Sequence, residues 1–303
     1  MILVLICISI GIFLRRTGKL TSAAAPIFNS FVIWISLPAL VIEKIHALSE
    51  SQLYSKAMVL PISMPWLQVA FAATFYWAAK RWTRQSKAVL GTLLLTLGFG
   101  NTSFVGFPLL RALIGTQAIP PAVLLDQLGS FLALSTVGVI FATGGSHGFL
   151  GTVKRVITFP AFVALVFAVL TRRFEFPISF NEAVMALNAT LVPLALVSVG
   201  VQLNWNREAI FPRLKMLTLG LGIKLVVFPL LVAGLYRLWL SPGSLEYSVI
   251  VLESGMAPMI TAGILASESG FDPELASLMV GVGIPLSLVT VSVWATLLRV
   301  IAP

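Results

Sequence analysis

Apolar residues run through this chain in long blocks that short polar or charged stretches separate. A helix needs about 20 apolar residues to cross the ~30 Å hydrocarbon core of a bilayer. Ten blocks come near that length, so the pattern predicts ten membrane-spanning helices. Their ranges are about 1–14, 26–43, 57–79, 88–114, 118–143, 156–171, 183–203, 214–240, 245–267 and 274–299.

Two of these blocks are interrupted in the middle by small and polar residues. Glycine inside a helix costs roughly 1 kcal/mol and proline about 3 kcal/mol relative to alanine. In a bilayer, such breaks persist where they are buried in protein or line a polar cavity. The interruption in the fourth block holds Gly98, Gly100, Asn101, Thr102, Ser103, Gly106 and Pro108, and that in the ninth holds Glu253, Ser254, Gly255 and Pro258.

The irregularities recur in the same order in the two halves of the chain. The second block contains a Leu-Pro-Ala-Leu turn at 37–40, the seventh contains Asn188 and Pro193, and the fourth and ninth are the interrupted pair. The order predicts an all-α membrane protein of two five-helix repeats, residues 1–143 and 156–303, joined by a linker at 144–155. Because five is odd, the second repeat enters the membrane from the opposite side, and the repeats are inverted. Interrupted segments at matching places in two repeats indicate the substrate site of a secondary transporter.

Composition supports a membrane protein and excludes a nucleic-acid partner. The chain has 303 residues, of which 58% are hydrophobic and 10% charged, whereas a soluble domain carries about 25% charged residues. The net charge of +9 lies in loops and forms no basic face interleaved with aromatic residues, as nucleic-acid binding would need. Loops after the odd-numbered blocks carry about twice the lysine and arginine of the opposite side, which places them and the linker in the cytoplasm. Both termini are then outside.

Ionisable residues within the blocks are candidates for function, because a charge is expensive at that depth. Asp126 and Glu253 are candidates for proton or sodium coupling. Lys224 can either snorkel or pair inside the protein, and we expect Arg111 to snorkel to the outer interface. Glu43 falls near the end of its block, where headgroup water can reach a carboxylate.

The two interruptions also offer a place for a substrate. They open half-helix N-termini, whose free N–H groups and positive dipole end suit a carboxylate. We predict that Asn101, Thr102, Ser103, Gly106, Pro108, Gly255 and Pro258 bind the substrate. The alternative is that the polar side chains only satisfy the kinked backbone or hold helices together. One cysteine and two distant histidines predict no metal site and no cofactor.

The run from Asn101 to Leu110, NTSFVGFPLL, resembles the N-T-x-x-x-G-x-P-L-L signature of the auxin efflux carrier (PIN-like) family. Ala257-Pro258, with ILASE at 264–268 and DPELA at 272–276, is similar to that family's ninth helix, and the turn at 37–40 fits as well. The chain lacks a long central cytoplasmic loop, so it looks like the short prokaryotic members. We therefore expect it in a bacterial cytoplasmic (inner) membrane.

The resemblance implies a fold, a motion and a substrate class. The fold has ten helices in two inverted repeats, with the fourth and ninth crossing at Pro108 and Pro258. A scaffold of spans 1, 2, 6 and 7 would carry a transport unit of spans 3–5 and 8–10 that moves like an elevator. The substrate would be a small organic anion, malate-like or auxin-like, with its carboxylate against Asn101. The partners would be this anion and the lipid bilayer, and a homodimer stays open. Two cases of coupling also stay open: a uniporter driven by the membrane potential, or symport of H⁺ or Na⁺ through Asp126 or Glu253.

Two other functions compete with an anion carrier. A Na⁺/H⁺ antiporter or a bile-acid-type Na⁺ symporter also has crossing broken helices, but we would expect more carboxylates within its spans. An intramembrane protease needs two embedded aspartates or a Ser–His pair. Here only Asp126 qualifies, and neither His46 nor His147 lies within a span. The catalytic constellation is missing, so we do not expect an enzyme.

Overall fold

The computed structural model describes residues 2–21, 23–48, 55–143, 148–202 and 207–301, and their regular secondary structure is helical. In the labels used below, η marks a π-helical turn, except that η3 is a 3₁₀ turn. The elements are α1 (Ile2–Arg16), α2 (Ala24–Phe31), η1 (Val32–Ser36), α3 (Leu37–His46), α5 (Lys56–Trp82), α6 (Lys87–Gly98), η2 (Thr102–Gly106), α7 (Phe107–Leu113), η3 (Thr116–Ala118), α8 (Ile119–Leu124), η4 (Leu125–Phe131), η5 (Leu134–Gly138), α9 (Val139–Thr143), α10 (Gly148–Ile157), α11 (Pro160–Thr171), α12 (Ile178–Ala189), α13 (Leu191–Gln202), α14 (Arg207–Gly222), η6 (Ile223–Val227), α15 (Phe228–Tyr236), α16 (Leu245–Ser254), α17 (Ile260–Glu268) and α18 (Pro273–Ile301).

Six helical segments of the described chain are long and apolar enough to cross a membrane. They are Ala24–His46, Met58–Trp82, Thr116–Ala142, Ile178–Gln202, Ile210–Tyr236 and Pro273–Val300, and shorter apolar helices cover Lys87–Gly98, Thr102–Leu113 and Pro160–Thr171. Many of their large apolar side chains are exposed, Trp77 and Leu230 among them, as contact with lipid requires. The protein is therefore an all-helical integral membrane protein, as the pattern predicts.

Three of the prolines inside helical segments follow a π-turn, and the helix continues past each of them. In each case the residue before the proline donates its backbone N–H to the carbonyl five residues earlier: Leu37 to Val32, Phe107 to Thr102 and Phe228 to Ile223. Proline lacks an N–H, and its ring clashes with the carbonyl four residues earlier. Widening the preceding turn moves that carbonyl away, so the helix continues past Pro38, Pro108 and Pro229.

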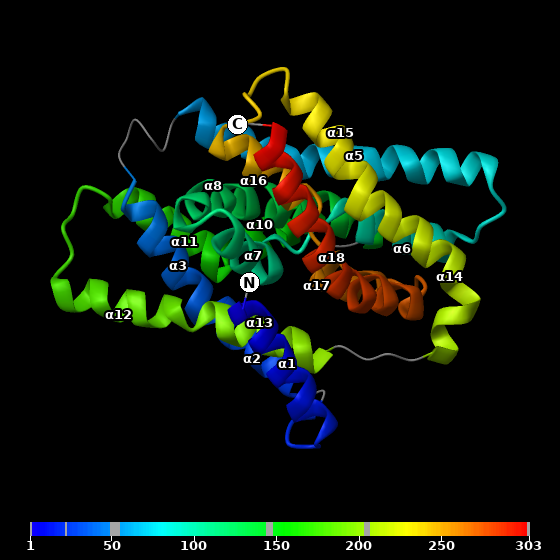
Figure 1. Cartoon of the computed structure of the whole chain (residues 1–303), viewed down its shortest axis with the longest axis horizontal. Helices are drawn as coiled ribbons and strands as arrows, with labels where there is room; N and C mark the ends of the chain where they lie inside the picture. The colour runs from blue at the N-terminus through cyan, green and yellow to red at the C-terminus, as the bar shows by residue number, and fades with distance from the viewer. Residues whose placement is uncertain (1, 22, 49–54, 144–147, 203–206, 302–303) are drawn as a thin grey trace.

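The helices pack into two groups. The first bundle contains α1, α2–α3, α11 and α12–α13, in which α1 and α2 lie on α13 while α11 and α12 lie on α3. Figure 1 shows α1, α2 and α13 together at the lower middle of the view, away from α5 and α14. The second bundle contains α5, α6–α7, α8–α9, α14–α15, α16–α17 and α18, linked by contacts such as α5 with α6 and α17 with α18.

Polar side chains join the second and seventh predicted spans inside the first bundle. Ser198 donates to the side-chain oxygen of Asn29, the hydroxyls of Ser36 and Thr190 are 2.7 Å apart, and Asn188 donates to Glu43 at 2.6 Å. Glu43 also pairs with its neighbour Lys44. This carboxylate therefore holds two helices together, where the sequence led us to expect only contact with headgroup water.

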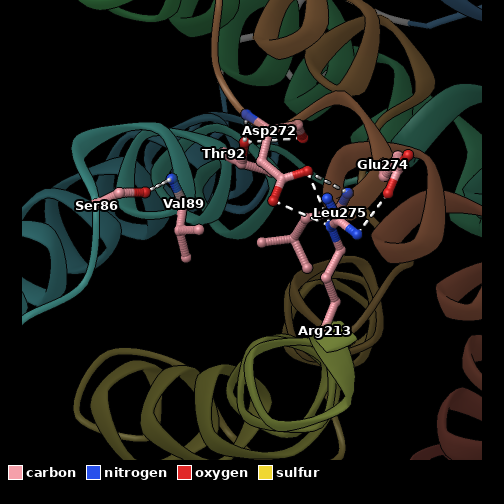
Figure 2. Close-up of polar contacts among 7 residues, drawn as sticks. All are labelled: Ser86, Val89, Thr92, Arg213, Asp272, Glu274 and Leu275. Atoms are coloured by element: carbon pink, nitrogen blue, oxygen red, sulfur yellow. Dashed lines mark hydrogen bonds and ion pairs between the residues drawn. The ribbon is translucent and has the colours of Figure 1, made fainter. Parts of the chain in front are cut away.

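An ionic cluster fixes the turn between α17 and α18 to two other helices of the second bundle (Figure 2). Arg213 of α14 donates to both carboxylate oxygens of Asp272, at 3.0 and 3.1 Å, and pairs with Glu274. The backbone N–H of Asp272 donates to the Thr92 hydroxyl of α6, and the Asp272 carboxylate caps α18 at Leu275. Four elements are thus tied at one point.

The linker differs from the loop that we expected. Residues 148–157 form the helix α10, which packs against η5 and α11, and residues 144–147 lie outside the described part of the chain. Leu150, Val153 and Ile157 recur at helical spacing beside Lys154, which is the pattern of an amphipathic helix. Leu150 and Ile157 are largely exposed, so this helix carries apolar residues on its outer face.

Candidate functional site

The two interrupted segments cross and complete each other's backbone hydrogen bonds. The chain is non-helical over residues 99–101, between α6 and η2, and over residues 255–259, between α16 and α17. The N–H of Asn101 donates to the Ala257 carbonyl at 2.8 Å, and that of Met259 donates to the Phe99 carbonyl at 2.9 Å. Gly100 and Pro258 form an antiparallel bridge between them. Each break thus supplies partners that lipid could not.

The breaks are shorter than the sequence indicates. Gly106 lies in η2 and Pro108 in α7, both within helix, because the π-turn accommodates the proline. Glu253 and Ser254 are the last residues of α16, so the second break begins at Gly255. Glycine, proline and polar residues show where a helix is weakened. Which residues are non-helical depends on the backbone hydrogen bonds with the other broken segment.

Asn101 stands at the crossing and has an unused donor. Its side-chain oxygen accepts the backbone N–H of Phe104 at 3.2 Å and so caps η2. Its amide nitrogen Nδ2 is buried and has no hydrogen-bond partner among the described residues. A buried amide without a partner is expensive, so this nitrogen is a candidate to bind a ligand.

Asn101 lines a cavity of about 280 Å³ between the two bundles. The first bundle contributes Ile33 and Leu37, and Phe159 directly precedes α11. The remaining walls come from η2, η4, η5, α9 and α17 of the second bundle. Most of the wall is apolar, including three phenylalanines, and its polar side chains are Asn101, Ser103, Asp126, Ser135, Thr261 and Glu268. Apolar walls with a few convergent polar groups are typical of a small-molecule site.

Asp126 connects the fifth predicted span to the first break. Its side chain is 3% exposed, so it is buried in the protein. It accepts a short hydrogen bond from the Thr102 hydroxyl and another from the Gln127 amide at 2.6 Å. Two donors therefore hold this carboxylate at the edge of the cavity.

A second buried carboxylate and a buried ammonium lie on the other side of the crossing. Glu253 is fully buried, and neither of its oxygens has a hydrogen-bond partner among the described residues. Lys224 in η6 is also fully buried and donates to the Leu97 carbonyl, at the end of α6, at 3.2 Å. A Cβ added to Gly100 would lie 3.4 Å from the Lys224 nitrogen. Lys224 is thus inside the protein, whereas Arg111 is exposed, as we expected.

The sequence matches a known protein family over nearly its whole length. Residues 1–148 and 149–295 match the Mem_trans family, described as membrane transport protein. The chain belongs to this family of membrane transport proteins. The match confirms the resemblance to auxin efflux carriers that the run from Asn101 to Leu110 indicates.

Two curated relatives cover nearly the whole chain of this transporter. An uncharacterized transporter of Methanothermobacter thermautotrophicus is 26% identical, over 97% of this chain and 96% of its own. An uncharacterized transporter of Methanocaldococcus jannaschii is 23% identical, over 98% of this chain and 97% of its own. The likeness therefore extends over all the elements that build the cavity.

The residues that the sequence singles out fall into two sets within the transporter. Asn101, Ser103 and Asp126 line the cavity together. The others lie around it: Thr102 bonds to Asp126, Gly106 faces the Glu253 carboxylate, Pro108 is buried in α7, Gly255 packs on Pro229, and Pro258 forms the bridge with Gly100. The described residues contain no group of three or more metal-ligating side chains.

Sequence reasoning missed the walls of the cavity. Thr261 and Glu268 of α17 and the phenylalanines at 104, 131 and 159 were not candidates. A weak signal exists in α17, where Thr261, Leu265 and Glu268 recur at intervals of four and three and therefore share one face. No signal in the sequence places Phe159 opposite Phe131, although their rings stack with centroids 3.9 Å apart.

Proposed function

We propose that this protein is a secondary transporter that carries a small organic anion, through its carboxylate, across the cytoplasmic membrane. The observation that carries the proposal is the buried, partnerless amide nitrogen of Asn101, a residue that lines the cavity at the crossing of the two broken helices. That nitrogen offers two N–H donors and no acceptor, which suits a carboxylate oxygen.

A helix terminus adds to this preference for a negative group. The nine-residue helix α17 starts at Ile260, no side chain caps it, and Met259, Ile260 and Thr261 line the cavity. The first N–H groups of a helix have no intrahelical partner, and the dipole gives this end a partial positive charge. A carboxylate placed between the Asn101 amide and this terminus would receive donors from two sides.

We further propose two inverted five-helix repeats and an elevator-type motion. The two segments that match the family meet at residues 148 and 149, inside the predicted linker, and the two broken helices cross antiparallel. The cavity lies between the first bundle, which corresponds to the expected scaffold, and the second, which corresponds to the expected transport unit. Sliding the second bundle along the first would carry the site across the membrane.

The charge pattern of the loops also suggests which side the cavity serves. Its polar lining extends from Asn101 at the crossing to Glu268 at the end of α17. In the orientation derived from lysine and arginine, that end faces the cytoplasm. We therefore propose that this conformation is open toward the cytoplasm.

The test replaces Asn101 while keeping its structural role. Asn101→Ser retains an oxygen that can cap η2 but removes the amide donor, whereas Asn101→Ala removes both. In proteoliposomes, we expect both variants to lose at least tenfold in anion uptake, and the serine variant to keep near wild-type thermal stability. Asn181→Ser, at an exposed site in α12, is the matched control. Full uptake by Asn101→Ser would refute the proposed site.

A cation exchanger or cation-coupled symporter is the second candidate. It is favoured by the unpartnered oxygens of Glu253, since a buried carboxylate without a donor is suited to take up a proton or a cation. In the first proposal the same residue would carry a coupled proton. The two functions differ in whether binding requires an organic anion.

A further inference from the structure

We infer that the cavity selects organic monoanions with an apolar body over dianions, and that Glu268 at its mouth is a specificity-determining residue. The inference rests on the proposed function, because it concerns the substrate of that same site. It follows from the charges that line the cavity and from where they stand.

The cavity contains acidic groups and no basic one. Asp126 and Glu268 line it, and no lysine or arginine does so among the described residues. The buried ammonium of Lys224 is not available either, because it points to the Leu97 carbonyl and is not part of the cavity wall. An anion bound in this cavity must therefore be stabilised by uncharged hydrogen-bond donors.

Those donors suffice for one carboxylate. Asn101 and the first turn of α17 both line the inner end of the cavity, and the Asp126 carboxylate nearby accepts hydrogen bonds from Thr102 and Gln127. A second carboxylate would have to lie further along the cavity, toward Glu268. Like charges repel more strongly in a protein cavity than in bulk water, so a dianion would bind more weakly.

The walls favour an apolar substrate body. Phe104, Phe131 and Phe159 stand on different elements around the cavity, with Phe131 and Phe159 stacked. Burying apolar surface against such side chains is favourable. A ring or short alkyl chain attached to one carboxylate would match both ends of the site.

Glu268 occupies the mouth of the cavity. It is the last residue of α17, it is exposed, and it lines both this cavity and an adjoining one of about 260 Å³ that reaches Gln202 of α13. It makes no hydrogen bond or ion pair that would hold it elsewhere among the described contacts. Replacing it should change selection without disturbing the fold, whereas Asp126 is bonded into the crossing.

The experiment compares ligands of matched shape and different charge. Purified full-length protein is titrated at pH 8, where diacids are fully ionised, and dissociation constants are taken from thermal shifts. The matched pair is 4-nitrobenzoate with terephthalate, whose nitro and carboxylate groups have the same shape. A second pair, butyrate with succinate, shares a four-carbon chain but not its shape. We expect each monoanion to bind at least tenfold more tightly than its dianion.

Two variants assign the effect to the mouth of the cavity. In Glu268→Gln the ratio between the two dissociation constants should fall at least threefold, through tighter binding of the dianion. Glu182→Gln makes the same chemical change at an exposed site in α12 and should leave the ratio unchanged. An unaltered ratio in Glu268→Gln would remove Glu268 from the selection.

The outcomes separate this inference from the proposed function. Equal binding of both members of each pair, lost in Asn101→Ser, would overturn the selection for monoanions and leave the anion site standing. Binding that does not respond to Asn101→Ser would contradict the proposed site. The absence of a shift with any carboxylate, or a shift with phenethylammonium alone, would overturn both proposals.

Discussion

At the scale of single residues, the transporter concentrates its buried charges around one crossing. Glu253 and Lys224 are fully buried, and Gly106 leaves room for the Glu253 carboxylate. A Cβ on Gly106 would lie 2.6 and 2.7 Å from the two Glu253 oxygens. Any residue other than glycine at position 106 would therefore force the Glu253 carboxylate to move. The position of this carboxylate thus depends on a glycine in the opposite broken helix.

Glu253→Gln tests whether this carboxylate carries a coupled proton. The amide has the same shape but cannot bind and release a proton, so we expect uptake to lose its dependence on pH while binding of the anion persists. Transport is measured in proteoliposomes at fixed membrane potential, with Glu182→Gln as the control. An unchanged pH profile would assign Glu253 a structural role.

The sequence identifies a single functional residue when the energetic cost of burying its polar side chain in a membrane is enough to single it out. Asn101, Asp126 and Glu253 are polar within apolar blocks, and all three lie at or beside the crossing. It could not decide between the two expectations for Lys224, because that depends on a carbonyl contributed 127 positions earlier in the chain. Glu268 and Phe159 were missed because a carboxylate or ring near a helix end is ordinary until folding brings it to a cavity.

At the scale of helices, close packing of α1 on α13 depends on two glycines that face each other. A Cβ on Gly200 would lie 2.3 Å from the Ile8 carbonyl oxygen and 2.9 Å from the Gly11 Cα. These are backbone atoms, which cannot rotate away as a side chain could. Small residues let membrane helices approach in this way.

Gly200→Ala should therefore lower the stability of the protein. We expect a loss of about 1–3 kcal/mol, the usual cost of overpacking, measured as a lower midpoint of thermal unfolding in detergent. Gly234→Ala is the matched control, since a Cβ there meets nothing within 4 Å. It should keep or raise stability, by up to ~1 kcal/mol from helix propensity. A Gly200→Ala protein as stable as the wild type would contradict the tight contact.

The helices also show which structural features a sequence pattern leaves out. The apolar blocks predict the positions of the long helices well, because burial in lipid imposes a minimum length. The π-turns before Pro38, Pro108 and Pro229 leave no mark on hydropathy, because they answer a local clash at the proline. Hydropathy does not predict the helix α10, because its ten residues are too few for a span.

At the scale of the whole molecule, the orientation of the chain in the membrane determines to which side the cavity opens. The loop charges predict that residues 83–86 lie in the cytoplasm and residues 237–244 outside. The same rule places Ser22 and Ser146 in the cytoplasm, but both lie outside the described residues. Gln85 and Ser241 are exposed and can report on the two sides.

Cysteine labelling of intact cells tests this orientation. A membrane-impermeant maleimide should label Ser241→Cys directly, and Gln85→Cys only after the cells are permeabilised. The native Cys7 is buried, so the wild-type protein supplies a low background. Labelling of Gln85→Cys in intact cells, with Ser241→Cys protected, would show that the protein has the opposite orientation in the membrane. The cavity would then open to the outside, and Glu268 would select substrates at the outer face of the membrane rather than at the cytoplasmic face.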